Sequence, residues 1–433
     1  MKNLDLLEKN KLVKLLNAFA NKSFKNGEVE YEYEDKPYQY LIQALYNIPE
    51  IQEIYDGDIL MYGIEKVIKK RFQTLPVKFK EDDIEEVIAE ITSTLKFNLA
   101  DHIIVVPIHS AQFKNVIKID NLTFIPQDYS KEDKIKIISQ VAKKTYDETL
   151  WITDHTEKSR SEHFLKYPLL LIKQTHQTST VHYNSLNIAK IIIYSIRCFY
   201  YGNIHKTSKD KTSFLYWASA SLKEASHLAI YSKENWRQNH KPLNFDVSLP
   251  FDINWLEEKG TARTFKKFLD RIYFDKNLDD FNVCFLNALI LFNESIKQDT
   301  SISTIITMTI AESILTQNRN EKRLRIAAII PRLMSFPKNI QKKISRDFDQ
   351  LYHKRNNFVH SGESVSISYD FETSEPTILE RGRKIIAQLI LNYPKFENIV
   401  EKKVVANDTT NKQIIRMKYW SNHVDSIFHD IIF

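Results

Sequence analysis

Hydrophobic residues in the first hundred positions recur at intervals of three and four residues. This spacing predicts amphipathic helices, because such positions fall on one face of an α-helix. A short alternating segment at 28–34 predicts one strand among them. The residues that carry the helical pattern are Leu4, Leu7, Leu12, Leu15 and Leu16, and then Ile84, Val87, Ile88, Ile91 and Leu95.

The pattern changes near residue 103, where compact β-branched segments alternate with helical ones. The segment 102–109 reads HIIVVPIH and predicts a strand, and 115–126 predicts two strands joined at Asp120 and Asn121. A further strand is expected at 167–174. Helices are expected at 131–145 and at 184–202, where Ser185 is a candidate N-terminal cap. Residues 1–275 are therefore expected to form an α+β region, with a possible internal break near 100–110.

From about residue 276 the periodicity is helical throughout. We expect five helices joined by short loops, with Asp299 or Thr300 capping the second, a new helix after Pro337, and a short closing helix within 401–433. Helices connected in this way form bundles. The predicted fold class is mainly α, with an N-terminal α+β region (1–275) followed by a C-terminal helical bundle and its closing tail (276–433).

Composition excludes several common kinds of site. The chain has 7 glycines, none in the spacing of a glycine-rich phosphate loop, and 2 cysteines, too few for a disulfide framework or a cysteine-rich zinc site. The first residues are charged where a signal peptide needs an apolar core, and no apolar run approaches the roughly 20 residues that span a bilayer. We expect a cytoplasmic protein that needs no membrane, metal or cofactor.

Basic residues are concentrated in one segment of the C-terminal part. Residues 318–355 contain 11 Lys or Arg against three acids, a net +8, whereas the whole chain carries +6. Ordinary solvated helix faces would account for this excess. A phosphate-binding surface beside residues 352–362 would account for it equally well.

The segment LYHKRNNFVHSGE (351–363) contains the strongest candidate for chemistry. Tyr352, Asn356 and His360 are spaced by four residues, so on a helix they share a face, which Arg355 borders. Gly362 is suited to the end of that helix. An arginine fork binds phosphate and stabilises developing negative charge, and histidine transfers protons near neutral pH. The pair suits attack of a ribose 2′-hydroxyl on the adjacent phosphate of RNA, and a two-fold dimer would supply the second histidine.

The Arg-Asn-x-x-x-His pattern at the end of a late helix resembles the HEPN superfamily. The longer string LYHKRNNFVHSG looks like the Apea-like HEPN branch of bacterial defence proteins, and TMTIAESILT (307–316) is similar to the acidic helix that precedes the motif there. The resemblance covers about 276–400. It implies a HEPN-like bundle and a dimeric, metal-independent endoribonuclease in which Arg355 and His360 are catalytic, Asn356 supports them and Glu312 is an orienting acid.

The hypothesis is therefore a ribonuclease effector of anti-phage or toxin-type defence, whose N-terminal region restrains it or senses a phage-derived or other trigger. RNA contacts are expected from Tyr352, Lys354, Arg346 and Lys343. The alternative is a HEPN module without catalysis, which dimerises or binds RNA or a nucleotide together with a partner protein. A structural polar cluster is the plain alternative for Arg355 with His360. For Glu312, a salt bridge of purely structural purpose is as plausible as a catalytic one.

Overall fold

The protein is mainly helical, with a β-sheet in its N-terminal region, as the sequence predicts. The structure is a computed structural model. It describes residues 6–25, 27–30, 32, 35–52, 57–72, 77–97, 99–108, 111–150, 164–177, 181–204, 228–232, 236–239, 251–274, 279–316, 320–362, 365, 376–406 and 412–432.

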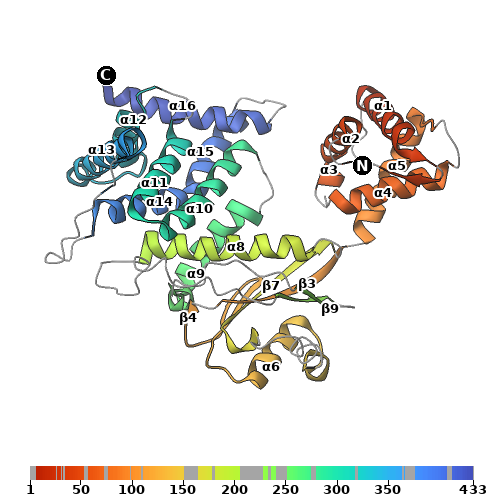
Figure 1. The fold of residues 1–433 in the computed structure, drawn as a ribbon, viewed down its shortest axis with the longest axis horizontal. Coiled ribbons are helices and arrows are strands. Elements are labelled where there is room, and N and C mark those ends of the chain that lie inside the picture. The colour runs from red at the N-terminus through yellow and green to blue at the C-terminus, as the bar shows by residue number, and fades with distance from the viewer. Residues whose placement is uncertain are drawn as a thin grey trace.

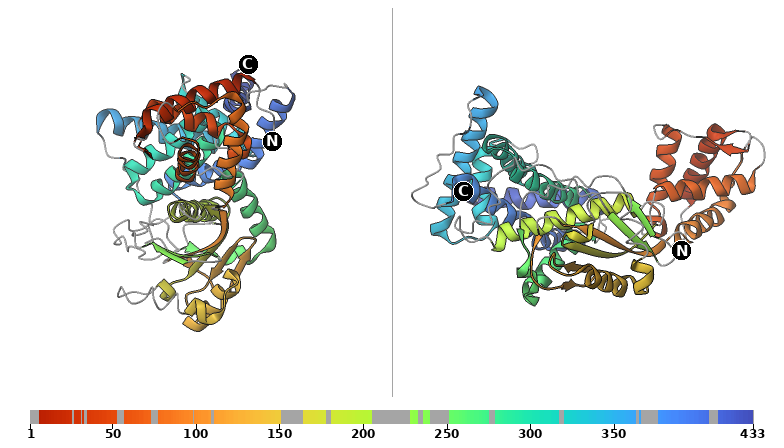
Figure 2. Two further views of the ribbon diagram at one scale, coloured as in Figure 1. Left: turned by 90° about the vertical axis from the view of Figure 1, so that its right-hand side faces the viewer. Right: turned by 60° about the horizontal axis from the view of Figure 1, so that its bottom comes forward.

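The first helices form a lobe with its own hydrophobic core, which lies apart from the C-terminal helices in Figure 1 and in the right-hand view of Figure 2. They are α1 (Leu6–Ser23), α2 (Lys36–Tyr46), α3 (Pro49–Gln52), α4 (Gly57–Arg71) and α5 (Ile84–Phe97). Strand β1 (Phe24–Lys25) pairs with β2 (Glu28–Val29), so the strand expected at 28–34 begins as predicted but is shorter. Residues 31, 33 and 34 lie outside the described residues.

A six-stranded antiparallel sheet follows, in the order β5-β6-β7-β3-β8-β9. Its central strands, β3 (Leu99–Pro107) and β7 (Leu169–Gln177), pair along their whole length. The hairpin predicted at Asp120 is confirmed, since β5 (Ile117–Ile119) and β6 (Leu122–Ile125) meet there. The outer strands are β8 (Leu228–Ser232) and β9 (Trp236–Asn239), and the short β4 (Ala111–Gln112) and β10 (Phe251–Asp252) pair separately.

Both faces of this sheet are buried, which explains the unbroken apolar run in β3. Ile103 and Val105 face a small core with α6 (Lys131–Ala142), whereas Ile104 and Val106 face the main core with α8 (Val181–Phe199). Successive side chains of a strand point to opposite faces. Helix α8 begins four residues before Ser185, so the prediction that Ser185 caps it is wrong.

The main core continues across residue 275 into the C-terminal helices. Helix α9 (Lys259–Leu269) precedes that position, and the C-terminal helices are α10 (Asp280–Lys297), α11 (Thr300–Leu315), α12 (Lys322–Leu333), α13 (Lys338–Ser361), α14 (Ile378–Leu391), α15 (Tyr393–Ala406) and α16 (Lys412–Ile432). The predicted cap of α11 is confirmed, because the Asp299 carboxylate accepts from the backbone N–H groups of Ser301 and Ile302. Within the described ranges, no helix is both long and apolar enough to cross a membrane.

The closing segment is more extensive than the short helix expected within 401–433. Helix α16 is 21 residues long and buries Trp420 completely in the main core. Trp420 Nε1 donates to the carbonyl oxygen of Ile314 at 2.8 Å, so α16 braces the C-terminal end of α11.

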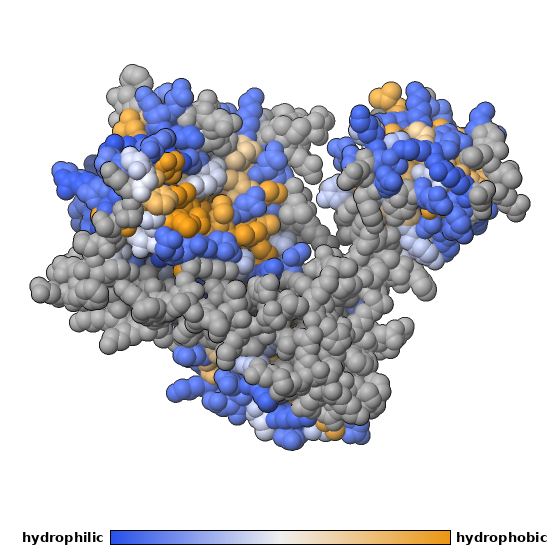
Figure 3. All heavy atoms as spheres, in the orientation of Figure 1, coloured by the Kyte–Doolittle hydropathy of each residue, from blue (hydrophilic) through white to orange (hydrophobic). Residues whose placement is uncertain are grey.

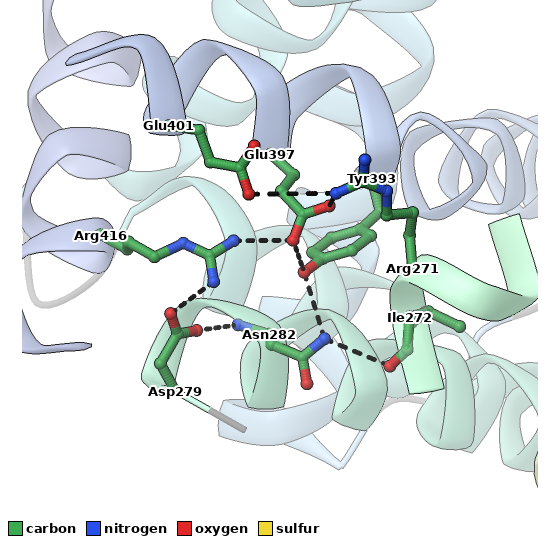
Figure 4. Close-up of polar contacts among 8 residues, drawn as sticks. All are labelled: Arg271, Ile272, Asp279, Asn282, Tyr393, Glu397, Glu401 and Arg416. Carbon is green, nitrogen blue, oxygen red and sulfur yellow. Dashed lines mark hydrogen bonds and ion pairs between the residues drawn. The ribbon is translucent and has the colours of Figure 1, made fainter. Parts of the chain in front are cut away.

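A buried polar network fastens α16 to α10 and α15 (Figure 4). Arg416 donates to Asp279 at 2.7 Å and to Glu397 at 2.8 Å, and the Tyr393 hydroxyl donates to Glu397 at 2.9 Å. Burial would lower the pKa of Arg416, but Asp279, Tyr393 and Glu397 outweigh it and raise that pKa. Arg416 therefore remains charged and satisfies two buried carboxylates.

Candidate functional site

The motif residues lie on the last three turns of α13. The helix runs without interruption through Tyr352, Asn356 and His360, so these residues follow one another at successive turns as the spacing predicts. It ends at Gly362, whose φ of +69° is a left-handed conformation that glycine adopts without strain. His360 therefore stands in the final turn, and its side chain is exposed.

Arg355 is held from three sides. Its Nη1 donates to Asn356 Oδ1 at 3.0 Å, and its Nη2 lies 3.6 Å from a carboxylate oxygen of Glu312. The guanidinium carbon lies 5.5 Å from the centre of the Tyr352 ring. Its side chain is 22% exposed, so a guanidinium with five N–H donors is fixed in place and still reachable from solvent.

Glu312 comes from α11 and is shared by two cations. Besides Arg355, Lys322 at the start of α12 places Nζ 3.3 Å from the other carboxylate oxygen. The carboxylate is 14% exposed, and a buried carboxylate is stable only when it is paired. The structure therefore brings Glu312 to Arg355, as the sequence led us to expect.

Lys322 was missed as a site residue. The sequence showed only one of many basic residues in 318–355, and nothing in the spacing connects a helix start with a residue of the preceding helix. An acid within an apolar helix is the one signal that could have prompted a search for a second cation, because such an acid needs partners.

Tyr352, which the sequence predicts to contact RNA, is instead a buried residue that packs against Arg355. It is 8% exposed, and its ring lies beneath the guanidinium of Arg355. Burial of its hydroxyl raises the pKa of Tyr352, the negative charge of Glu312 raises it further, and Arg355 partly offsets both effects. The hydroxyl thus stays protonated at neutral pH.

His360 stands apart from the cluster within one chain. Among the described residues it makes no hydrogen bond or ion pair with Arg355, Asn356 or Glu312. The sequence predicts that Asn356 supports both Arg355 and His360, and among the described residues it accepts a hydrogen bond from Arg355 and makes none with His360. A single copy of the chain therefore presents a fixed cation and a separate, freely accessible imidazole.

Apolar side chains are exposed around this end of α13. Val359, next to His360, is 49% exposed, and Ile302 at the start of α11 is 39% exposed. The N–H of Val365 donates to the hydroxyl of Ser301 at 2.9 Å, so the chain leaving α13 lies beside the start of α11. Figure 3 shows a hydrophobic patch over α10 and α11.

Two of the other expected RNA contacts, Arg346 and Lys343, lie away from Arg355. Arg346 precedes it by nine residues, which at about 100° per residue places the two on opposite faces of α13. Lys343 lines a mainly apolar pocket of about 280 Å³ with Asp347 and Arg381. Lys354 is half-buried beside Arg355. RNA binding by these lysines and Arg346 stays a prediction.

In the part of the chain that the structure describes, no three His, Cys, Asp or Glu residues lie close enough together to hold a metal ion. The candidate site is instead a fixed arginine, an exposed histidine and a bridging acid.

None of the protein-family models, curated proteins or solved structures compared with the chain matches the chain. Its function must therefore be inferred from the site itself.

Proposed function

We propose that the protein is a metal-independent endoribonuclease that acts in the cytoplasm as a homodimer, in anti-phage or toxin-type defence. One observation carries this proposal: Arg355 is fixed by Glu312, Asn356 and Tyr352 at a helix end where His360 stays exposed. A fixed cation and an accessible proton carrier are what cleavage of a phosphodiester through the ribose 2′-hydroxyl requires.

The proposed reaction is a single displacement at phosphorus that uses charge stabilisation by Arg355 and proton transfer by His360. The 2′-oxygen forms a bond to phosphorus while the bond from phosphorus to the 5′-oxygen breaks, which leaves a 2′,3′-cyclic phosphate and a 5′-hydroxyl. One imidazole takes the proton of the 2′-hydroxyl and a second protonates the departing 5′-oxygen. Arg355 stabilises the negative charge that develops on the phosphate oxygens.

A single chain supplies one His360, so the proposal needs two copies. The exposed Val359 and Ile302 give a reason for them to meet, because burying apolar surface drives association. In a two-fold dimer each copy buries the same patch. Joining these faces would bring two α13 ends, and thus two Arg355 and two His360 residues, to one groove. Residues 1–275 would then receive the trigger, a phage product or another signal.

A non-catalytic module is the second candidate. It is favoured by the contacts of Arg355 itself, since a guanidinium paired with a buried carboxylate and an amide is also a common structural arrangement. In that case the same face would serve for dimerisation or for binding a partner, RNA or nucleotide.

The two candidates are separated by RNA cleavage with matched variants. Purified wild type should degrade single-stranded RNA in excess chelator, and Arg355→Ala or His360→Ala should lower the rate at least about 100-fold. The controls are His353→Ala on an exposed position of the same helix and Arg263→Ala on α9, which should both cleave normally. Equal cleavage by wild type and both site variants would reject the nuclease.

A further inference from the structure

A row of cations runs along the first half of α13, ahead of the motif residues. Lys338, Lys342 and Arg346 are spaced by four residues and are all exposed. Residues at this spacing lie one above another on a helix, about 6 Å apart along its axis. The row therefore presents three positive charges in line over the first half of α13.

Helix α12 lies beside this row, and the two helices form a groove between them. Arg332 of α12 lines a groove of about 490 Å³ together with Lys338 and Lys342 of α13. The remaining lining is uncharged, and it contains no acidic and no aromatic side chain; these residues are Ala327, Ala328, Pro331, Gln341 and Ser345. We call this surface the α12–α13 groove, with Arg346 as its extension.

These cations differ from their neighbours in having no acidic partner. Within 322–355, Lys322 pairs with Glu312, Arg323 with Asp349, and Arg325 with Asp425. Among the described residues, no carboxylate lies within ion-pair distance of the groove cations, which are Arg332, Lys338, Lys342 and Arg346. The groove and its extension thus gather four cations of the segment that have no acidic partner among the described residues.

The direction of α13 adds to the positive potential. The groove lies at the N-terminal end of a 24-residue helix, where the backbone dipoles place partial positive charge. The Pro337 carbonyl accepts from the N–H groups of Ile340 and Gln341, which leaves the earlier N–H groups of the first turn free of intrahelical partners. Side chains and helix end therefore favour an anion at the same place.

We propose that the α12–α13 groove binds the phosphate backbone of RNA, at a site separate from the one that carries Arg355 and His360. The inference rests on the proposed function, because RNA is the anion that a ribonuclease must hold. Several cations in a line fit a polymer with a phosphate at every residue better than a single small anion. The groove offers no aromatic ring for base stacking, so the binding is independent of sequence.

Binding of RNA in this groove would also explain the basic residues of 318–355 that do not belong to the cleavage site. Because the row lies nine to 17 residues before Arg355, about 14–26 Å along the helix axis, it holds a part of the RNA other than the scissile phosphate. Contacts of this kind raise affinity for long RNA and leave the chemistry at the motif unchanged.

The test measures RNA binding in the Arg355→Ala/His360→Ala background, in which cleavage cannot interfere. The groove variant is Lys338→Gln/Lys342→Gln/Arg346→Gln. Its control is Lys11→Gln/Lys14→Gln/Lys66→Gln, which removes the same charge from exposed positions of α1 and α4. Fluorescence anisotropy with two unrelated single-stranded RNAs, repeated over a range of salt concentrations, reports affinity and the number of phosphate contacts.

The groove variant should lose at least tenfold in affinity for both RNAs, and its salt slope should fall by about 2, roughly 0.7 for each of three lost contacts. The control should bind as the background does. Equal affinity of groove variant and control would reject the groove, as would competition by micromolar ATP or inorganic phosphate, or a preference for anionic lipid vesicles over RNA. Groove-dependent binding by a wild type that cleaves nothing would retain the groove and reject the nuclease.

Discussion

Glu312 and Arg355 form an ion pair, with 3.6 Å between carboxylate oxygen and guanidinium nitrogen, that joins α11 to the motif end of α13. Lys322 approaches the same carboxylate from α12. Three helices therefore converge on one acid. Glu312 therefore has two roles, to position Arg355 and to stabilise the packing of these helices, and RNA cleavage and unfolding measure them separately.

Glu312→Gln tests this positioning. The variant keeps the shape of the side chain but removes the charge that both cations require, so the free energy of unfolding should fall by about 1–3 kcal/mol. Because Arg355 is then less firmly held, RNA cleavage should fall about tenfold. Asp349→Asn is the control, since it removes a more exposed ion pair, with Arg323, that contributes about 0–1 kcal/mol. Matching losses in the two variants, in urea unfolding and in activity, would contradict the positioning role.

The exposed apolar residues near His360 predict a concentration-dependent dimer. Val359→Asp, or Ile302→Asp, places a charge that would have to be desolvated in the interface and should convert the protein to monomer. Sedimentation velocity measures this change directly. Tyr62→Asp, an exposed aromatic residue of α4, is the control and should leave the dimer intact. Dimers that survive both substitutions near His360 would place the interface elsewhere.

The network around Arg416 predicts that α16 is an integral part of the fold. Arg416→Ala leaves Asp279 and Glu397 buried without their cation, which should lower the free energy of unfolding by about 3–5 kcal/mol. Lys418→Ala, two residues away and exposed, should change it by no more than about 0.5 kcal/mol. Chemical denaturation compares the two variants. A small effect of Arg416→Ala would show that α16 adds little to stability.

Lys134 predicts a pH dependence of stability in the N-terminal region. It is fully buried, and its Nζ donates to the carbonyl oxygens of Gln127, Leu165 and Tyr167. Burial lowers the pKa of Lys134 from 10.5 to about 8, against a smaller opposing effect of Asp128. Between these two values the folded chain binds fewer protons than the unfolded chain, so this contribution to stability rises with pH.

The measurement compares wild type with Lys134→Met in urea at several pH values. The advantage of wild type over the variant should grow by about 2 kcal/mol between pH 7 and pH 9.5, because most of that interval lies between the two pKa values. Subtracting the variant removes the titration of the other groups. A difference that stays constant, or shrinks as the pH rises, would show that burial does not control this lysine.

Local patterns in the sequence predicted the elements that carry the site, because each depends on residues close together in the chain. Apolar periodicity was sufficient for α11 and α13, and Asp299 and Gly362 marked a start and an end. The contacts between helices were harder to predict from the sequence. The pairing of Glu312 with Lys322 and with Arg355 depends on packing that no spacing encodes.

A charged residue within an apolar stripe made α16 harder to recognise as a core helix from the sequence. In α16, Arg416 occupies the same stripe as Trp420, Val424 and Phe428, so the segment resembled a weakly amphipathic tail and not a core helix. Its partners Asp279 and Glu397 are distant in the chain. The groove cations are a related case, since the sequence shows an excess of charge but not which residues already have partners.

The chemistry of the RNA ends tests the central claim most directly. RNA cleaved by wild type in excess chelator should carry 2′,3′-cyclic phosphate and 5′-hydroxyl ends, which mass spectrometry of the fragments identifies, and His360→Ala should produce none. Such ends arise only when the ribose 2′-oxygen is the nucleophile. Fragments with 3′-hydroxyl and 5′-phosphate ends, or cleavage that stops when chelator is added, would contradict a cleavage site built from Arg355 and His360.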